Sequence, residues 1–185
     1  LNLATQEWVL SIDADERVTP KLKQEILAVI SSKESANCYA IPRSSWYCGR
    51  FMKHSGWYPD YVDRLFKRGT AKFSDHLVHE RLLPSGTVGQ LQNHFLHYSF
   101  KDFSQVLKKI DAYSTASAEQ AYLKGKRSSV GKAVGHGLWA FFRTYVLRLG
   151  FLDGAQGLAL AISNAEGTYY RYIKIWLLEE SGKSK

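Results

Sequence analysis

Two aspartates stand one residue apart, directly after an apolar segment near the start of the chain. Asp13 and Asp15 follow residues 8–12, whose sequence WVLSI predicts a strand buried on both faces of a sheet. Side chains two positions apart point to the same side of an extended chain, so the two carboxylates can converge if Ala14 is extended. Such oxygen ligands suit Mg²⁺ or Mn²⁺ bound to a diphosphate. The alternative is a structural role, in which the aspartates cap a helix or fill a turn.

The segment that follows the aspartates predicts a helix. The Thr19 hydroxyl can accept a hydrogen bond from a free backbone N–H, and Pro20 is tolerated in a first helical turn. In open α/β sheets, ligands bind beyond the carboxyl ends of the strands. A strand, a short acidic turn and a helix are therefore suitable elements to position a metal and diphosphate site.

The rest of the chain changes character near residue 100. Short strands are predicted at 37–43 and within 61–83, with a long loop at 49–60 between them. Apolar residues at helical spacing begin after Lys101. The sequence therefore predicts an α/β fold class, in which a sheet-bearing section precedes a helical one.

Charge is distributed unevenly along the 185 residues. The net charge is +8, of which residues 1–100 carry +2 and residues 101–185 carry +6. Basic side chains near apolar helix faces are typical of helices that dock on anionic lipid. Nucleic acid is the competing anionic partner, but no RRM, KH or helix-turn-helix signature accompanies the charge, so a nucleic-acid partner is not expected.

Other classes are disfavoured by simple features of the sequence. The apolar run LWAFF at 138–142 is far too short to cross a bilayer, which takes roughly 20 residues. Cys38 and Cys48 lack the spacing of a disulfide framework or a structural zinc site, which fits a reducing compartment.

Several segments together resemble a known family. The segment EWVLSIDADERVTPKLKQEI (7–26) resembles the DxD segment of family 2 glycosyltransferases with the GT-A fold, and more narrowly the bacterial lipopolysaccharide core β-glucosyltransferase group. The resemblance continues in the same order through GWYPDYVDRLFKRG (56–69), VHERL (78–82), LHYSF (96–100) and GFLDGAQGLALA (150–161). It covers most of the chain, and this series of motifs is far more specific than a DxD motif alone.

The resemblance implies an inverting sugar transfer from a nucleotide sugar. In that family, the last aspartate of the DxD motif binds the metal, so Asp15 is the expected ligand of Mg²⁺ or Mn²⁺, and Asp13 is expected to assist it at the metal and to help hold the donor diphosphate. Glu80 is the expected catalytic base, which accepts the proton of the acceptor hydroxyl. The alternative for Glu80 is a surface ion pair with Arg81.

Five further residues are candidates for ligand contacts. Arg64 matches an arginine of the family and is expected on the donor diphosphate, where His97 is a further candidate. Trp57 and Tyr58 can stack on an acceptor sugar, and His79 lies beside Glu80. The structural alternatives are an ion pair at the sheet edge for Arg64, a core position for His97 and burial of the loop for the two aromatic residues.

The function expected from these residues is transfer of glucose from UDP-glucose to a lipopolysaccharide core acceptor. Residues 1–100 are expected to form part of a GT-A catalytic domain, and residues 101–185 a helical section that associates with a membrane. In the family, the strands that bind the nucleotide precede the DxD motif, so we expect this chain to be the later part of a longer enzyme. The expected location is cytoplasmic, on the inner membrane. The alternative is a non-catalytic, basic module that binds a membrane surface or the acceptor.

Overall fold

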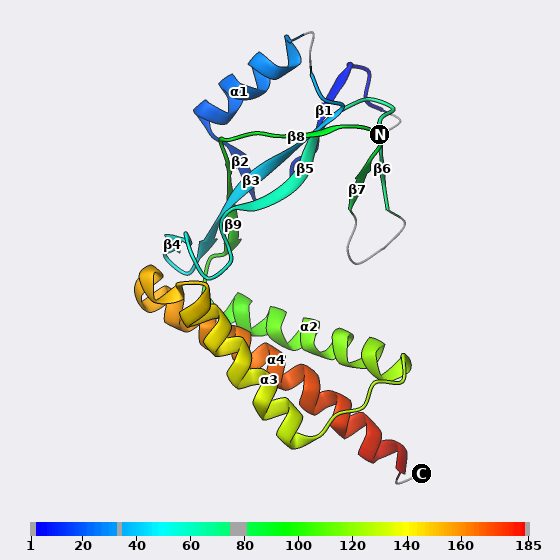
Figure 1. Cartoon of the computed structure of the whole chain (residues 1–185), viewed down its shortest axis with the longest axis vertical. Helices are drawn as coiled ribbons and strands as arrows, with labels where there is room; N and C mark the ends of the chain where they lie inside the picture. Colours follow the sequence, from blue (N-terminus) through cyan, green and yellow to red (C-terminus); the bar gives the residue numbers. More distant parts are fainter. Residues whose placement is uncertain (1–2, 33–34, 75–80, 184–185) are drawn as a thin grey trace. The chain divides into compact units, whose positions relative to one another are not determined.

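The chain divides into two compact units. The computed structural model describes residues 3–32, 35–74 and 81–183. Unit 1 comprises Leu1–Ser45 and Tyr58–Ser99, and unit 2 comprises Trp46–Trp57 and Phe100–Lys185. The predicted fold class is confirmed, because a mixed sheet consistent with part of a GT-A-like domain is followed by helices (Figure 1).

A mixed sheet dominates the first hundred residues. Its strand order in the described part of the chain is β1-β5-β3-β9-β2, and β4 and β8 also pair with β3. The strands are β1 (Trp8–Leu10), β2 (Glu16–Val18), β3 (Cys38–Tyr47), β4 (Arg50–Phe51), β5 (Asp60–Lys67), β8 (Val88–Gln90) and β9 (Phe95–Phe100). The pairs β1–β5, β3–β5 and β2–β9 are antiparallel, and β3–β8 is parallel. Two further strands, β6 (Ala71–Phe73) and β7 (Leu82–Pro84), form a separate antiparallel pair.

The strand before the aspartates differs from its prediction. β1 stands at one end of the strand order, and its three residues are only half-buried. The prediction of burial on both faces was therefore wrong for this strand in the described structure. Its apolar side chains pack instead on one antiparallel neighbour, β5, and against the hydrophobic core of unit 1.

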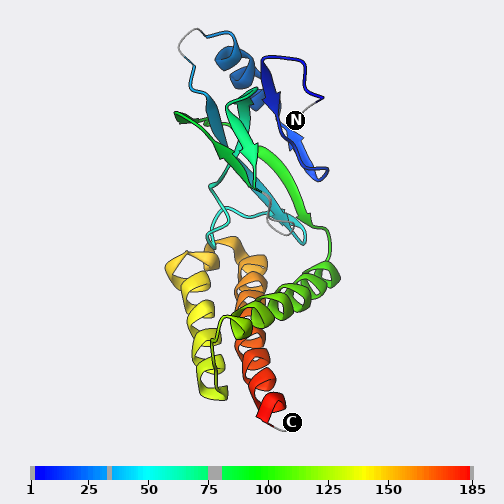
Figure 2. The ribbon, with the colours of Figure 1, turned by 90° about the vertical axis from the view of Figure 1, so that its right-hand side faces the viewer.

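Helix α1 (Pro20–Ile30) begins where the sequence predicts. The Thr19 hydroxyl accepts a hydrogen bond from the backbone N–H of Leu22, at 3.2 Å, and Pro20 occupies the first turn. Leu22 and Ile26, one turn apart, point into the core of unit 1. They pack there with residues from the sheet and the segment before β9, namely Ile41, Leu65, Leu91 and Phe95. This packing anchors the helix that follows the acidic turn. Figure 2 shows the backbone of this helix and of the sheet in unit 1.

Unit 2 is mainly helical. Its helices are α2 (Phe103–Leu123), α3 (Val130–Phe142), the short π-helix η1 (Arg143–Leu147), the 3₁₀ helix η2 (Gly150–Asp153) and α4 (Gly154–Lys183). The long helix α4 packs against both α2 and α3. Each of α2 and α3 begins with a side-chain cap, from Asp102 and Ser129 respectively. No single described helix is long and apolar enough to cross a membrane, although Val130–Leu147 and Gly150–Gly182, bent by 71°, together have the length and composition of a broken span.

Asp153 joins the 46–57 segment to the helices within unit 2. Its fully buried carboxylate accepts hydrogen bonds from the backbone N–H groups of Lys53, at 3.2 Å, and His54, at 2.8 Å. A guanidinium nitrogen of Arg50 lies 3.4 Å from the same carboxylate, and another donates to the Asp153 carbonyl at 2.8 Å. The aspartate of the GFLDG sequence therefore has a structural role within unit 2.

We expect Cys38 to react slowly with alkylating reagents in the folded protein. Burial, with a smaller contribution from Asp63, raises the pKa of Cys38 from 9.0 to about 11. Because the thiolate is the reactive form, a Cys48→Ser variant should be alkylated by iodoacetamide at pH 8 at least about tenfold more slowly in buffer than in urea. Between pH 9 and pH 11 the unfolded chain loses a proton that the folded chain keeps, so this thiol makes the free energy of unfolding fall as pH rises. Equal alkylation rates in buffer and urea would contradict the assignment.

Candidate functional site

The two aspartates of the DxD motif lie in a tight turn rather than in a continued strand. The backbone N–H of Glu16 donates to the carbonyl of Asp13 at 3.0 Å, and residues 14 and 15 form the turn. The extended conformation therefore ends before Ala14. Asp13 and Asp15 do not share one strand face, and their carboxylates contact different partners, Arg64 and His97 respectively.

Glu16, the residue after the motif, is the buried anchor of this turn. Its side chain is fully buried, and its carboxylate lies 3.1 Å from Arg64 and 3.6 Å from Arg43. It also accepts a hydrogen bond from the backbone N–H of Asp13, at 2.9 Å. A buried carboxylate needs such compensation, because desolvation of an unpaired charge costs several kcal/mol. The buried carboxylate of Glu16 and the two arginines that it contacts therefore hold the acidic turn in place on its buried side.

The two arginines come from neighbouring strands of the sheet. Arg43 lies on β3 and stands opposite Asp60 of β5, whose carboxylate it contacts at 2.5 Å. Arg64 lies further along β5 and pairs with Asp13 as well as Glu16. The sheet therefore presents two guanidinium groups to the acidic turn, and together they contact three carboxylates, those of Asp13, Glu16 and Asp60.

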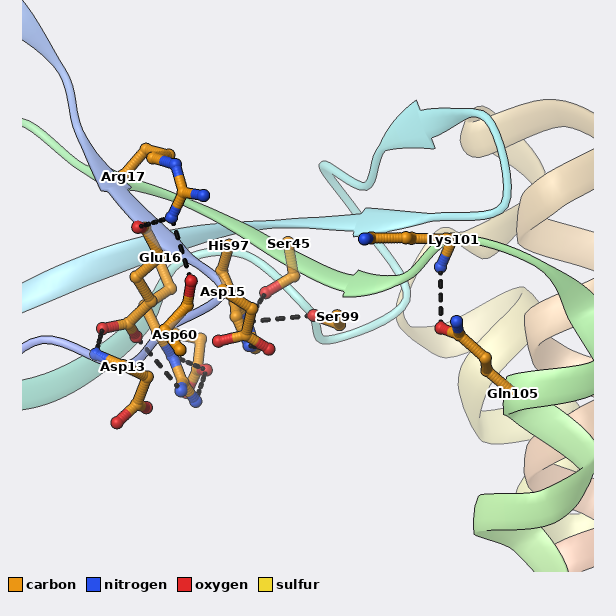
Figure 3. A network of polar contacts seen from close by, with 12 residues as sticks. Asp13, Asp15, Glu16, Arg17, Ser45, Asp60, His97, Ser99, Lys101 and Gln105 are labelled. Carbon is orange, nitrogen blue, oxygen red and sulfur yellow. Dashed lines mark hydrogen bonds and ion pairs between the residues drawn. The ribbon is translucent and has the colours of Figure 1, made fainter.

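Asp15 lies beside His97 because β2 and β9 pair in a fixed register. Glu16 stands opposite His97 in that pair, and the Asp15 carbonyl accepts from the backbone N–H of Tyr98 at 2.9 Å. The imidazole Nε2 is 3.4 Å from the Asp15 carboxylate. Its Nδ1 lies 3.0 Å from the Ser45 hydroxyl and 2.9 Å from the Ser99 hydroxyl (Figure 3).

The surroundings of the imidazole favour its neutral form. Burial, followed by the positive charge of Arg43, lowers the pKa of His97 below its ordinary value, although Asp15 and Glu16 act in the opposite direction. A neutral imidazole retains a lone pair for a hydrogen bond or a metal. His97 is therefore suited to orient Asp15 or to contact a ligand bound there.

The donor set suits a hard divalent cation that keeps most of its own water and phosphate ligands. The Asp13 and Asp15 carboxylates are each about half exposed, at 51% and 50%. Within residues 3–32, 35–74 and 81–183, no three His, Cys, Asp or Glu side chains lie close enough together to hold a metal ion. Magnesium usually takes only one or two protein carboxylates. An accessible Asp15 beside a neutral His97 fits such an ion better than it fits a closed structural site.

The remaining predicted site residues occupy different places. Arg64 is an ion-pair partner of Asp13 and Glu16, so its guanidinium supports the acidic turn. Tyr58 belongs to unit 1 and packs edge-on against His94, with ring centroids 6.0 Å apart. Trp57 belongs to unit 2, where its ring contacts other aromatic side chains. Glu80 and His79 lie outside the described residues.

Glu16, Arg43 and Ser45 were not predicted as parts of the site. Glu16 was treated as part of a polar turn, because neither its neighbours nor its spacing indicate burial. A charged residue within an apolar strand is the one available signal for Arg43, since the IPR segment places an arginine between otherwise buried strand positions. The cross-strand contacts that define these roles depend on register, which the sequence pattern leaves open.

The site therefore combines an acidic turn, a pair of arginines and a histidine on a mixed sheet. This arrangement suits an anionic ligand, bound through a metal or directly.

No protein-family model matches the chain. The chain is 26% identical to the lipopolysaccharide core biosynthesis glycosyltransferase LpsC of Rhizobium meliloti, over 93% of this chain and 67% of that protein. It is also 26% identical to an uncharacterized glycosyltransferase of Rickettsia conorii, over 100% of this chain and 68% of that protein.

A third relative has the same kind of name. An uncharacterized glycosyltransferase of Rickettsia prowazekii is 24% identical, over 94% of this chain and 63% of that protein. The chain therefore spans about two thirds of the length of the curated relatives that it matches. These similarities make it a homologue of bacterial glycosyltransferases.

Proposed function

We propose that this chain is the acceptor-side and C-terminal part of an inverting glycosyltransferase of family 2. The observation that supports this most strongly is similarity to proteins named as glycosyltransferases along nearly the whole chain. The proposed donor is UDP-glucose, and the proposed acceptor is a lipopolysaccharide core, by analogy with the name of the Rhizobium meliloti relative. The acidic turn is the proposed site of the donor diphosphate.

In the proposed site, Asp15 binds Mg²⁺ or Mn²⁺. The ion supplies positive charge for the departing diphosphate when it is bound. Asp13 and Asp15 project from a turn that Glu16 fixes from beneath, so their carboxylates are positioned before the ligand arrives. Asp13 retains its contact with Arg64, and His97 holds Asp15 or contacts a phosphate oxygen.

Proton transfer is assigned to Glu80. In an inverting transfer, a carboxylate takes the proton of the acceptor hydroxyl as this oxygen bonds to the anomeric carbon and the bond to the nucleoside diphosphate breaks. Trp57, Tyr58 and His79 are the proposed acceptor contacts. These assignments come from the resemblance of the motifs VHERL and GWYPD to the family.

Metal-dependent binding of UDP is the experiment that tests the donor site. Calorimetry with UDP and Mn²⁺ should show binding by the unaltered chain, and Asp15→Asn should weaken it by at least about tenfold, because a principal metal ligand is lost. Asp111→Asn is the matched control, since Asp111 is an exposed aspartate on α2. Binding that is equal in Asp15→Asn and the control, or absent from the unaltered chain, would contradict a donor site in this chain.

A peripheral location on the cytoplasmic face of the inner membrane is the second part of the proposal. Between residues 120 and 165 the one acidic residue is Asp153, which is buried, whereas several basic residues are exposed. Large apolar side chains that are more than half exposed occur in the same stretch, namely Leu123, Leu138, Trp139, Leu147 and Leu152. Apolar and basic side chains without exposed acids favour an anionic lipid surface. The same observation supports the alternative function, a non-catalytic module that binds a membrane surface.

Co-sedimentation with vesicles tests this location. The chain should sediment with vesicles of phosphatidylglycerol and phosphatidylcholine at low salt, and less with phosphatidylcholine alone. Replacing Leu138 and Trp139 together by serine should reduce the bound fraction at every salt concentration, because apolar contacts are not screened by salt. Absence of co-sedimentation with both kinds of vesicle at low salt would contradict the proposal. Vesicle binding without UDP binding would favour the non-catalytic alternative.

A further inference from the structure

A hollow of about 380 Å³ lies within unit 2, and among the residues given a role in the proposed function only Trp57 lines it. It runs between helices α2 and α4, with one aromatic end formed by side chains that come from outside these two helices. Pockets that bind small ligands have volumes from about 300 Å³ upward. The hollow is therefore large enough for a small organic molecule.

Small residues on the two helices create this space. Ser114 and Ser117 of α2 face Ser163, Gly167 and Thr168 of α4 across it. Closely packed helices normally fill such positions with apolar side chains, and an unfilled cavity reduces stability. Several of the hydroxyl groups are already paired within the protein, as in the contact of 3.1 Å between Ser163 and the Tyr47 hydroxyl. The polar lining is therefore ordered before any ligand binds.

Three aromatic rings form one end of the hollow. The centroid of Tyr47 lies 5.5 Å from that of Trp57 and 6.0 Å from that of Phe100, and the Trp57 and Phe100 centroids are 6.1 Å apart. These contacts fix the orientation of each ring. Such a wall packs well against an alkyl chain or the apolar face of a sugar ring.

Two basic side chains, one from each helix, also line the hollow. The Lys109 ammonium lies 4.9 Å from the centroid of Phe100, and the Arg171 Nε is buried without a hydrogen-bond partner. Neither residue forms an ion pair with the acidic groups that the structure describes, and no described acidic side chain lines the hollow. By contrast, Lys174, one turn beyond Arg171 on α4, pairs with Asp111 at 2.7 Å. The hollow therefore combines an aromatic wall with two basic side chains that form no ion pair among the described residues.

We propose that this hollow binds an amphiphile in which a phosphate or carboxylate is joined to an apolar or ring-shaped body. The anionic group contacts Lys109 and Arg171, and the Arg171 Nε gains the acceptor that it lacks. The body packs against the aromatic wall. The shared chemistry includes anionic single-chain lipids and phosphorylated sugars. This inference does not depend on a catalytic role for the acidic turn, because all its residues belong to unit 2.

Fluorescence titration and calorimetry with four probes test the site. The probes are octyl phosphate, glucose 6-phosphate, inorganic phosphate and octyl glucoside, each used below its micelle concentration. We expect at least one of the first two to bind at least about tenfold more tightly than inorganic phosphate and octyl glucoside, because only these two combine both features. Tighter binding of octyl phosphate identifies a lipid as the ligand class, and tighter binding of glucose 6-phosphate identifies a sugar. Equal affinity for all four probes, or none, would overturn the proposal.

Matched variants locate the binding. Lys109→Gln should weaken binding by at least about tenfold, whereas Lys108→Gln, which alters the neighbouring exposed lysine outside the hollow, should leave it unchanged. Gly167→Leu should block the hollow, since a Cβ at Gly167 meets only Ile110 side-chain atoms, the nearest at 3.7 Å, and leucine favours a helix. Circular dichroism checks the fold of each variant, and Arg171→Gln replaces Gly167→Leu if that variant unfolds. Unchanged binding in Lys109→Gln and in the blocked variant would refute the site.

Discussion

Replacing Glu16 by alanine is expected to destabilise unit 1 by about 1–3 kcal/mol, because two arginines lose their shared buried carboxylate and keep only Asp13 and Asp60 as partners. Arg64 and Arg43 lie 3.1 Å and 3.6 Å from that carboxylate. The backbone N–H of Asp13 also loses its acceptor. Urea denaturation of the full chain should show this loss as a lower transition midpoint for the probes that report on unit 1.

The neutral analogue and an exposed glutamate separate charge from packing. Glu16→Gln keeps an oxygen that can accept from Asp13 but removes the charge, so its effect should lie between those of alanine and the unaltered chain. Glu7→Gln is the control, because Glu7 is exposed, and its effect should stay within about 0.5 kcal/mol. A Glu16→Ala variant as stable as Glu7→Gln would mean that the buried ion pairs do not stabilise the turn.

Replacing Asp153 by asparagine is expected to destabilise unit 2 by about 3–5 kcal/mol. The buried carboxylate accepts hydrogen bonds from two backbone N–H groups and faces the guanidinium of Arg50. An asparagine replaces one of its oxygens by an NH₂ group, which would face these donors and could not accept from them. Hydrogen exchange should reveal the change most clearly at the backbone amides of Lys53 and His54.

A second aspartate on the same unit provides the comparison. Asp111 is 80% exposed at its side chain and pairs with Lys174 at 2.7 Å. Because exposed ion pairs contribute about 0–1 kcal/mol, Asp111→Asn should change stability little. If the two substitutions had the same effect, the network around Asp153 would not be the support that its geometry indicates.

The elements of the fold were more predictable than the contacts between them. Thr19 and Pro20 marked the start of α1 correctly, because capping and the first-turn role of proline are local effects. The apolar run before Asp13 indicated a strand but not its place in the sheet, since half-buried and fully buried short strands have similar sequences. The membership of residues 46–57 in unit 2 has no local signal, because it depends on contacts with Asp153.

For the candidate site, the sequence identified the exposed aspartates, Arg64 and His97, and missed Glu16, Arg43 and Ser45, which contact them or one another. Asp13 and Asp15 stand out by their spacing, but an extended Ala14, the condition for both carboxylates to share one face, is not met, because the chain turns there. His97 was identified from a motif, and its position beside Asp15 follows from the pairing of β2 with β9. Glu16 gave no such signal, because its burial depends on Arg64 and Arg43 from distant strands.

The contacts of Asp153 also constrain how this protein can be divided. The chain passes between units three times, after Ser45, after Trp57 and after Ser99. A single cut near residue 100 would leave residues 46–57 on one fragment and Asp153 on the other. The hydrogen bonds from the Lys53 and His54 backbone to the Asp153 carboxylate would then be lost. During folding, the same contacts must close a loop of about a hundred residues, since Lys53 and Asp153 are 100 positions apart. Expression of the helical unit on its own would therefore require residues 46–57 to be grafted onto it rather than a simple truncation.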